Sequence, residues 1–427
     1  MKKIYFFLWI AMAPCFLHAQ LGNVLNKAKN KIQNRIDNKV DKAIDKELDI
    51  AEGKNKNEET SQSETGVAAA ETAKGGITAY SRYDFIPGDK IIYSEDFSQD
   101  EIGELPVNWN ASGKGEVVTL ENFQGRWLRL YPGMKYFSDN KKEYGQDYTV
   151  EFDVIIDGTA PSGTRFFPSF NLGLLGFGDQ NPASSDLFRE YLSKNVVSVN
   201  LQPNLDAISK MQLSTRYDNR NTFESDKQVV ASYSKSFFKV AHYAIQVQKQ
   251  RIRFWVNDQK IFDLPKAVNT GSPLNQLFFS VAEYWPYHDN NFGLYISNIK
   301  VASGLPDTRH KLVEEGSFST TGILFDVNSD VIKPESYGVI KEIATVLKEN
   351  ATLNIKVIGH TSADGDDAAN LKLSKARAAA VKELLAKEFN VDAVRISVDG
   401  KGESSPVADN KTKEGKEQNR RVEFVKA

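Results

Sequence analysis

The run Gly359-His360-Thr361-Ser362-Ala363-Asp364-Gly365, continuing through Asn370 and Leu373-Ser374 to Arg377-Ala378, decides the fold of the last quarter of this 427-residue chain. A second run, Asn419-Arg420-Arg421-Val422, follows near the end. The patterns predict Arg377 on a helix and Arg420 just before a strand. Guanidinium groups on rigid elements present a fixed fork of N–H donors. The two runs therefore predict a binding site for a carboxylate or an amino-acid zwitterion.

These runs and Phe325-Asp326-Val327-Asn328 stand in one order and spacing. Together they resemble the OmpA-like C-terminal domain, a periplasmic module that holds peptidoglycan, over residues 320–427. The alternation of strand and helix patterns predicts a mixed α/β sandwich of βαβαβ type. We expect strands at 323–325, 353–358, 395–398 and 422–425, and helices at 334–347 and 367–389.

The resemblance also implies a pocket for the diaminopimelate residue of the peptidoglycan stem peptide. It places Asn328, Ser362, Arg377 and Arg420 at that pocket. Arg377 is expected to bind the ligand carboxylate bidentately, and Arg420 to add charge or brace the pocket. Asn328 can donate and accept hydrogen bonds at once, which suits a zwitterion. No cofactor or metal is expected.

Ser362 departs from the family, which most often has an aspartate there to pair with the ligand ammonium. A hydroxyl cannot supply that charge, and a charged hydrogen bond contributes about 1.5–3 kcal/mol. Asp364 lies two residues on, before Gly365. Two alternatives stay open: Asp364 turns inward and supplies the charge, or it points at solvent. His360 is expected to be a structural hydrogen-bonding group, and Arg421 to face solvent or brace the fold.

Residues 80–303 have a different character. Dense aromatic residues and short alternating runs, such as 148–156 and 294–301, are separated by Gly, Pro, Asn and Asp. Alternation with a period of two predicts an antiparallel β-sandwich. The opening, Tyr93 to Ser98 followed by Leu105-Pro106 and Trp109, is similar to a concanavalin-A-like jelly roll of the laminin-G or lectin type. Residues 304–319 read as a polar connector.

Two functions are considered for this β-sandwich. Exposed aromatic side chains such as Tyr284, Trp285 and Tyr287 favour binding of a second glycan or a protein, although core packing explains such residues too. Glu151 and Asp153 have the spacing of paired carboxylates on one strand face, which a wall-tethered glycoside hydrolase would need. No further acid stands at Ile155 to complete a three-carboxylate pattern. The preferred prediction is therefore a non-enzymatic binding region.

The N-terminus predicts export. Lys2 and Lys3 precede an apolar run of about ten residues, and a small residue at Ala19 offers a cleavage site, so residues 1–19 read as a signal peptide. Cys15 is the only cysteine. Pro14 before it is a poor fit to the small residue of a lipobox, so we do not predict lipidation. The expected location is the periplasm, in association with the outer membrane and the cell wall.

Residues 21–52 predict an amphipathic charged helix with apolar residues every fourth position. A four-residue step drifts around the helix, so the apolar line does not form a straight seam. A solvated helix, a partner helix for oligomerisation and a lipid-surface helix remain alternatives. Residues 53–79 are polar, lack aromatic side chains, and read as a flexible linker. A structural assembly subunit joined through this helix is thus a further alternative function.

Composition narrows the class of protein. Hydrophobic residues make up 41% and charged residues 26%, which is ordinary for globular domains. The net charge of −2 gives no reason to expect a nucleic-acid partner. The sequence therefore predicts a multidomain, non-catalytic envelope protein whose main partner is peptidoglycan.

Overall fold

The computed structural model describes residues 83–427 apart from residues 141, 160–165, 178–183, 185, 205–207, 231–235, 258, 286 and 306. The predicted signal peptide with Cys15, the helix at 21–52 and the linker at 53–79 lie outside the described residues. Within the described part, no helix combines the length and hydropathy that crossing a bilayer requires. The described residues form two regions: the two-sheet region, residues 83–303, and the C-terminal region, residues 308–427.

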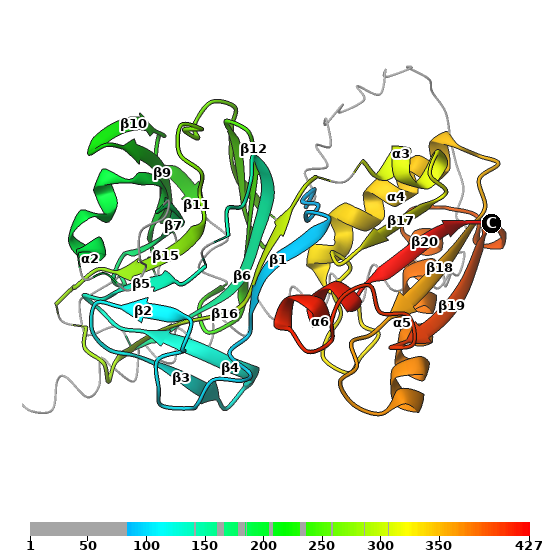
Figure 1. Ribbon diagram of the computed structural model, residues 1–427, viewed down its shortest axis with the longest axis horizontal. Helices are drawn as coiled ribbons and strands as arrows, with labels where there is room; N and C mark the ends of the chain where they lie inside the picture. Colours follow the sequence, from blue (N-terminus) through cyan, green and yellow to red (C-terminus); the bar gives the residue numbers. More distant parts are fainter. Residues whose placement is uncertain are drawn as a thin grey trace, which may run out of the picture. The chain divides into compact units, whose positions relative to one another are not determined.

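The two-sheet region consists of two eight-stranded sheets with antiparallel pairing (Figure 1). The first sheet runs β14-β13-β12-β6-β16-β4-β3, and β1 pairs with β16. Its strands are β1 (Lys90–Glu95), β3 (Gly115–Leu120), β4 (Phe123–Leu130), β6 (Asp147–Gly158), β12 (Ala241–Gln248), β13 (Arg251–Val256), β14 (Gln259–Leu264) and β16 (Phe292–Ser303).

The second sheet runs β10-β9-β8-β7-β15-β5-β2, and β11 pairs with β9. Its strands are β2 (Trp109–Ala111), β5 (Lys135–Ser138), β7 (Phe170–Gly176), β8 (Asn195–Gln202), β9 (Ser209–Tyr217), β10 (Arg220–Glu224), β11 (Gln228–Val230) and β15 (Gln276–Val281). The short helices α2 (Leu187–Glu190) and η1 (Tyr191–Ser193) precede β8.

Alternation along the strands explains why the two sheets pack face to face. On β6, Val150, Phe152 and Val154 enter the common core, so Glu151 and Asp153 lie on the opposite face. β8 repeats the pattern with buried apolar residues at alternate positions. This β-rich architecture agrees with the sequence prediction. Whether its connectivity is a jelly roll of the concanavalin-A-like type stays a prediction.

The C-terminal region has a four-stranded sheet in the order β17-β20-β18-β19, in which only the β18–β19 pair is parallel. The helices α4 and α5 lie against one face of this sheet (Figure 1). The elements are α3 (Thr308–Val313), β17 (Ser317–Thr320), η3 (Pro334–Ser336), α4 (Tyr337–Glu349), β18 (Ile355–His360), α5 (Asp367–Lys387), η4 (Ala393–Arg395), β19 (Ile396–Gly402), α6 (Lys413–Asn419) and β20 (Val422–Lys426).

The first predicted strand of this region is wrong. Residues 323–325 form no strand, and Phe325 makes only an isolated bridge with Ile332. The edge strand is β17, which comes earlier, and with α3 it occupies residues expected to be a connector. Leu312 and Phe318 explain this, because both are buried in the core of the C-terminal region. The helix α6 was not predicted.

Candidate ligand-binding site

Gly359 and Ser374 fix the distance between α5 and the sheet. A Cβ atom on Gly359 would lie 2.1 Å from the carbonyl oxygen of Ser374, so only glycine allows the helix to approach β18 this closely. The Ser374 hydroxyl accepts a hydrogen bond from the amide of Gly402 at 2.9 Å, which ties the helix to the end of β19. Arg377 lies one turn further along α5. The glycine and serine of the motif therefore determine where the Arg377 side chain starts.

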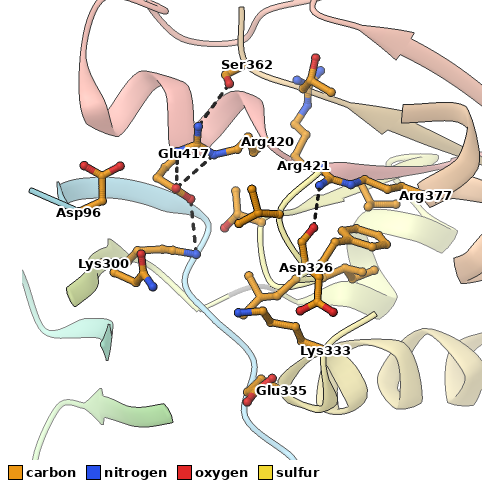
Figure 2. A pocket seen from close by; sticks show the side chains of 18 of the residues that line it. Asp96, Lys300, Asp326, Lys333, Glu335, Ser362, Arg377, Glu417, Arg420 and Arg421 are labelled. Atoms are coloured by element: carbon orange, nitrogen blue, oxygen red, sulfur yellow. Dashed lines mark hydrogen bonds and ion pairs between the residues drawn. The ribbon is translucent and has the colours of Figure 1, made fainter. Parts of the chain in front are cut away.

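Arg377 holds the loop after Phe325. Its Nε donates to the carbonyl of Ser329 at 2.9 Å, and its guanidinium lies 4.8 Å from the centre of the Phe325 ring. Nη2 donates a longer bond of 3.4 Å to the carbonyl of Asp326 (Figure 2). Burial and the neighbouring Arg420 lower the pKa of Arg377. The carboxylate of Asp330 acts on it in the opposite direction, but among the described residues no carboxylate forms an ion pair with this half-buried cation.

Arg420 is engaged differently. Its Nε donates to Glu417 at 3.1 Å and its Nη2 binds the same carboxylate. Lys300 of β16 reaches Glu417 from the two-sheet region at 3.4 Å, so Glu417 lies between two cations (Figure 2). Burial alone would raise the pKa of Glu417, but Lys300 and Arg420 lower it to about 2. Nη1 of Arg420 remains directed at the Ser362 hydroxyl, 3.2 Å away.

Asp364 lies beside Ser362. The Ser362 hydroxyl donates to the Asp364 carboxylate at 3.0 Å, and Lys416 binds the other oxygen at 2.6 Å. Arg420 stands 3.6 Å from the same carboxylate. Burial alone would raise the pKa of Asp364, but the bonds from Lys416 and Ser362 lower it overall. A carboxylate is therefore next to the serine, although two cations already compensate it.

One cavity of about 650 Å³ brings the five sequence-predicted residues together: it is lined, among others, by Asn328, Ser362, Asp364, Arg377 and Arg420. Asn328 is exposed and adopts a positive φ of 55°, which asparagine tolerates better than most residues. The arrangement offers an uncompensated guanidinium, a hydroxyl, an amide and a partly compensated carboxylate on one surface. Chemically, this suits a ligand that carries a carboxylate next to N–H donors.

His360 and Arg421 are structural in their contacts. Nε2 of His360 lies 3.2 Å from the Glu423 carboxylate. Burial and the nearby Arg421 lower the pKa of His360 to about 4, so the ring is neutral at physiological pH. Arg421 does not face solvent: only 6% of it is exposed, and it donates to the carbonyl of Ser405 at 3.1 Å. It braces the loop that precedes α6.

Glu151 and Asp153 lie on the same face of β6, as their spacing predicts, but both are buried. His242 of β12 stands between them, with Nδ1 2.8 Å from Asp153 and Nε2 3.5 Å from Glu151. Burial alone would lower the pKa of His242, but the two carboxylates raise it to about 10. The paired acids are therefore bound to an internal cation, an arrangement that leaves neither free to act as acid or nucleophile.

The aromatic candidates divide. Trp285 and Tyr284 are exposed, at 81% and 40%, whereas Tyr287 belongs to the core of the two-sheet region. Among the described residues no group of three or more His, Cys, Asp or Glu side chains is arranged to hold a metal ion. The sequence analysis missed Glu417, Lys416 and Lys300. A signal for Glu417 exists, since it stands three residues before Arg420, a spacing that pairs charges on a helix.

Residues 324–420 match the OmpA family. Outer membrane porin F of Pseudomonas fluorescens is 46% identical over 101 residues, which are 24% of this chain and 31% of that protein. Outer membrane protein A of Bordetella avium is 39% identical over 100 residues, 23% of this chain and 51% of that protein. The crystal structure of the peptidoglycan-associated lipoprotein of Burkholderia pseudomallei is 27% identical, with 26% of this chain and 89% of that chain covered and a TM-score of 0.24.

These matches concern the C-terminal region. The chain spans about a third to a half of the length of the two outer membrane proteins named here. Residues 324–420 are thus an OmpA-like domain, and every motif from Phe325 to Arg420 falls inside it. The similarity carries no information about the two-sheet region.

Proposed function

We propose that this protein is a non-catalytic component of the cell envelope that binds peptidoglycan through its C-terminal region. The ligand group is the diaminopimelate of the stem peptide, as the resemblance to OmpA-like domains implies. The protein is placed in the periplasm, associated with the outer membrane and the cell wall. The names of the two outer membrane relatives favour the same compartment for this chain.

The observation that carries the proposal is the unpaired Arg377 beside the cavity. Arg377 is half-buried, and a charge that is partly withdrawn from water is costly to leave without an ion-pair partner. Nε and Nη2 of Arg377 donate hydrogen bonds to backbone carbonyls, which position the side chain but do not neutralise its charge. A ligand carboxylate would supply the counter-charge. Arg420, already bound to Glu417, contributes positive potential and a hydrogen bond to Ser362.

In this proposal the ligand ammonium lies near Ser362, and Asp364 takes the place of the family's aspartate. Asp364 is already hydrogen-bonded to the Ser362 hydroxyl, so no long movement is needed. Its bond with Lys416 weakens the effect, because part of the negative charge is compensated before the ligand arrives. Asn328 adds a donor and an acceptor from the opposite loop.

A second ligand surface is proposed on the two-sheet region, which we take to be a lectin-like jelly roll. A cavity of about 290 Å³ lies on the second sheet, and amide and hydroxyl side chains line it, including Asn171, Asn200, Gln212 and Ser214. Tyr191 stands at its edge. Hydroxyl-rich ligands need convergent amides and an aromatic face, so a glycan is favoured here over a protein. Binding of cellulose, chitin and murein fragments by the full chain would test this surface.

The decisive experiment for the main proposal is sedimentation of the mature protein with purified sacculi. Wild type is expected to co-sediment, and Arg377→Ala to lose binding by about 100-fold, as truncating one partner of a buried charge contact costs roughly 2–5 kcal/mol. Arg377→Lys keeps the charge without the fork and should fall between them.

Arg309→Ala serves as the matched control. Arg309 lies on α3, 64% of its side chain is exposed, and it pairs with Glu349 away from the cavity. It should bind sacculi like wild type. Equal binding by wild type and Arg377→Ala would refute the proposed function.

A further inference from the structure

The cavity at Arg377 does not end at the C-terminal region. The first sheet of the two-sheet region forms its other side, with Asp153 of β6, His242 of β12, and Asn298 and Lys300 of β16 among the lining residues. These side chains come from the face of the sheet that points away from its own core. Figure 2 shows Lys300 extending toward Glu417, which also contacts Arg420.

Side chains of α6 hold this wall in place. Gln418 accepts a hydrogen bond from the amide of Ile91 at 2.8 Å and donates to the carbonyl of Asp89 at 3.2 Å. Its side-chain amide thus satisfies backbone groups that a neighbouring strand would otherwise pair with. Glu414 accepts from the amide of Ser94 at 3.2 Å, and Lys413 binds the buried Glu95. The edge of β1 is thereby covered, and β1 pairs with β16, which carries Asn298. The contact is specific and directional.

The cavity walls contain buried polar atoms that lack a hydrogen-bond partner among the described residues. They are Oε2 of Glu335, Oγ1 of Thr361 and Nδ1 of His360. Buried polar atoms are almost always hydrogen-bonded, so several orphans around one cavity indicate that a bound molecule completes them.

The size of the cavity points the same way. Pockets of roughly 300–1,000 Å³ hold whole drug-sized molecules. A space of about 650 Å³ is larger than one zwitterionic amino acid needs. The charged side chains that line it also fall into two parts: Arg377 and Arg420 in one, and Asp153 and Glu335 with His242 and Lys333 in the other. The second part therefore offers carboxylates as well as cations.

We propose that Asp153, His242 and Asn298, with Glu335 facing them, form a second subsite for the same ligand. It takes the N–H-bearing portion of the stem peptide that adjoins the residue held at Arg377. This inference rests on the proposed function. It makes the two-sheet region part of the peptidoglycan site: Asp153, Asn298 and Glu335 offer acceptors to ligand N–H groups, and His242 holds the Asp153 carboxylate in place.

The test measures the affinity of the full mature chain for two probes by calorimetry: free meso-diaminopimelate, and a muropeptide with a complete tripeptide stem. Asn298→Gly removes the amide while glycine tolerates the positive φ of 53° at this position. Glu335→Gln removes the charge without changing the shape. Each is expected to weaken muropeptide binding about three- to tenfold and to leave diaminopimelate binding within twofold. Asn219→Gly, at an exposed position with φ of 60° outside this cavity, is the matched control.

The outcomes separate the two proposals. Unchanged muropeptide affinity in both variants overturns the subsite while the proposed function stands. Equal losses for both probes also overturn it, since the effect would then act through Arg377. If wild type binds neither probe, the proposed function itself fails.

Discussion

His242 in the two-sheet region is a buried cation and Arg377 in the C-terminal region is a half-buried one, and their surroundings differ. His242 lies between two carboxylates of its own region, whereas Arg377 is held by backbone carbonyls and has no carboxylate partner among the described residues. The charge of His242 is thus neutralised inside the fold. The charge of Arg377 has no such ion pair and lies beside a cavity. Incomplete compensation therefore distinguishes a candidate ligand group from a structural ion pair.

The largest expected effect is on stability at His242. His242→Leu leaves Glu151 and Asp153 without their cation, and breaking a buried pair costs about 3–5 kcal/mol. Arg377→Ala should cost less, about 1–2 kcal/mol, because it loses hydrogen bonds to backbone carbonyls and the Phe325 contact but leaves no buried carboxylate without its cation. Urea unfolding of both variants checks the contrast. Similar losses in the two would remove the distinction drawn here.

The pH dependence of stability should follow His242 in alkaline solution. Its pKa is raised from about 6.5 in the unfolded chain to about 10, so its contribution is complete below pH 6.5 and is lost as pH rises toward 10. The free energy of unfolding can fall by about 1.4 kcal/mol per pH unit in this range. Urea unfolding midpoints between pH 6 and 10 measure this slope. Because lysine and tyrosine titrate nearby, the comparison with His242→Gln isolates the histidine, and an identical slope in that variant would contradict the assignment.

Lys300→Met tests the ion pair between Lys300 of the two-sheet region and Glu417 of the C-terminal region. Glu417 would keep only Arg420, so its pKa should rise from about 2 and the protein should lose about 1 kcal/mol at pH 7. A depressed carboxyl pKa stabilises above the unfolded value near 4.3 and loses its effect as pH falls toward 2. The difference between wild type and Lys300→Met should therefore vanish near pH 2. A difference that persists there would show that packing, not charge, accounts for Lys300.

The smallest effect is expected at Asp364. Asp364→Asn should weaken muropeptide binding about threefold, since exposed and already paired charges contribute little. Ser362→Asp is the complementary variant and should strengthen binding, because it restores the family's residue. If Asp364→Asn binds muropeptide as tightly as wild type, Asp364 does not replace the carboxylate that the family carries at the position of Ser362.

The sequence anticipated the C-terminal region in detail. The spacing of the motifs predicted Arg377 on a helix and Arg420 before a strand. It does so because the glycine, serine and asparagine residues in these runs each make a local contact that fixes the backbone around them. Gly359 permits the approach of α5, and Asn419 binds the amides of Val407 and Ala408. The strand predicted at 323–325 is wrong because Ile323 packs in the core and Phe325 makes only an isolated bridge, and periodicity does not separate such a segment from a strand of the sheet.

The two-sheet region was anticipated only as a pattern. Alternation shows which residues face a core, but it does not state which strands are neighbours. β6 pairs with β12 and β16, both far along the chain, and this pairing brings His242 and Asn298 to Asp153. No local signal marks His242 as the partner of Glu151 and Asp153. The spacing of Glu151 and Asp153 alone therefore does not separate a catalytic pair from a structural one.

The sequence by itself determined the OmpA-like domain, its cationic site and the β-rich character of the preceding region, because each depends on spacings within a few tens of residues. Only the tertiary structure decided that Lys300 shares Glu417 with Arg420, that Arg377 has no ion-pair partner among the described residues, and that the first sheet lines the same cavity. The physical reason is that these features depend on distances between residues far apart in the chain, such as Lys300 and Glu417, which are set only when the chain folds.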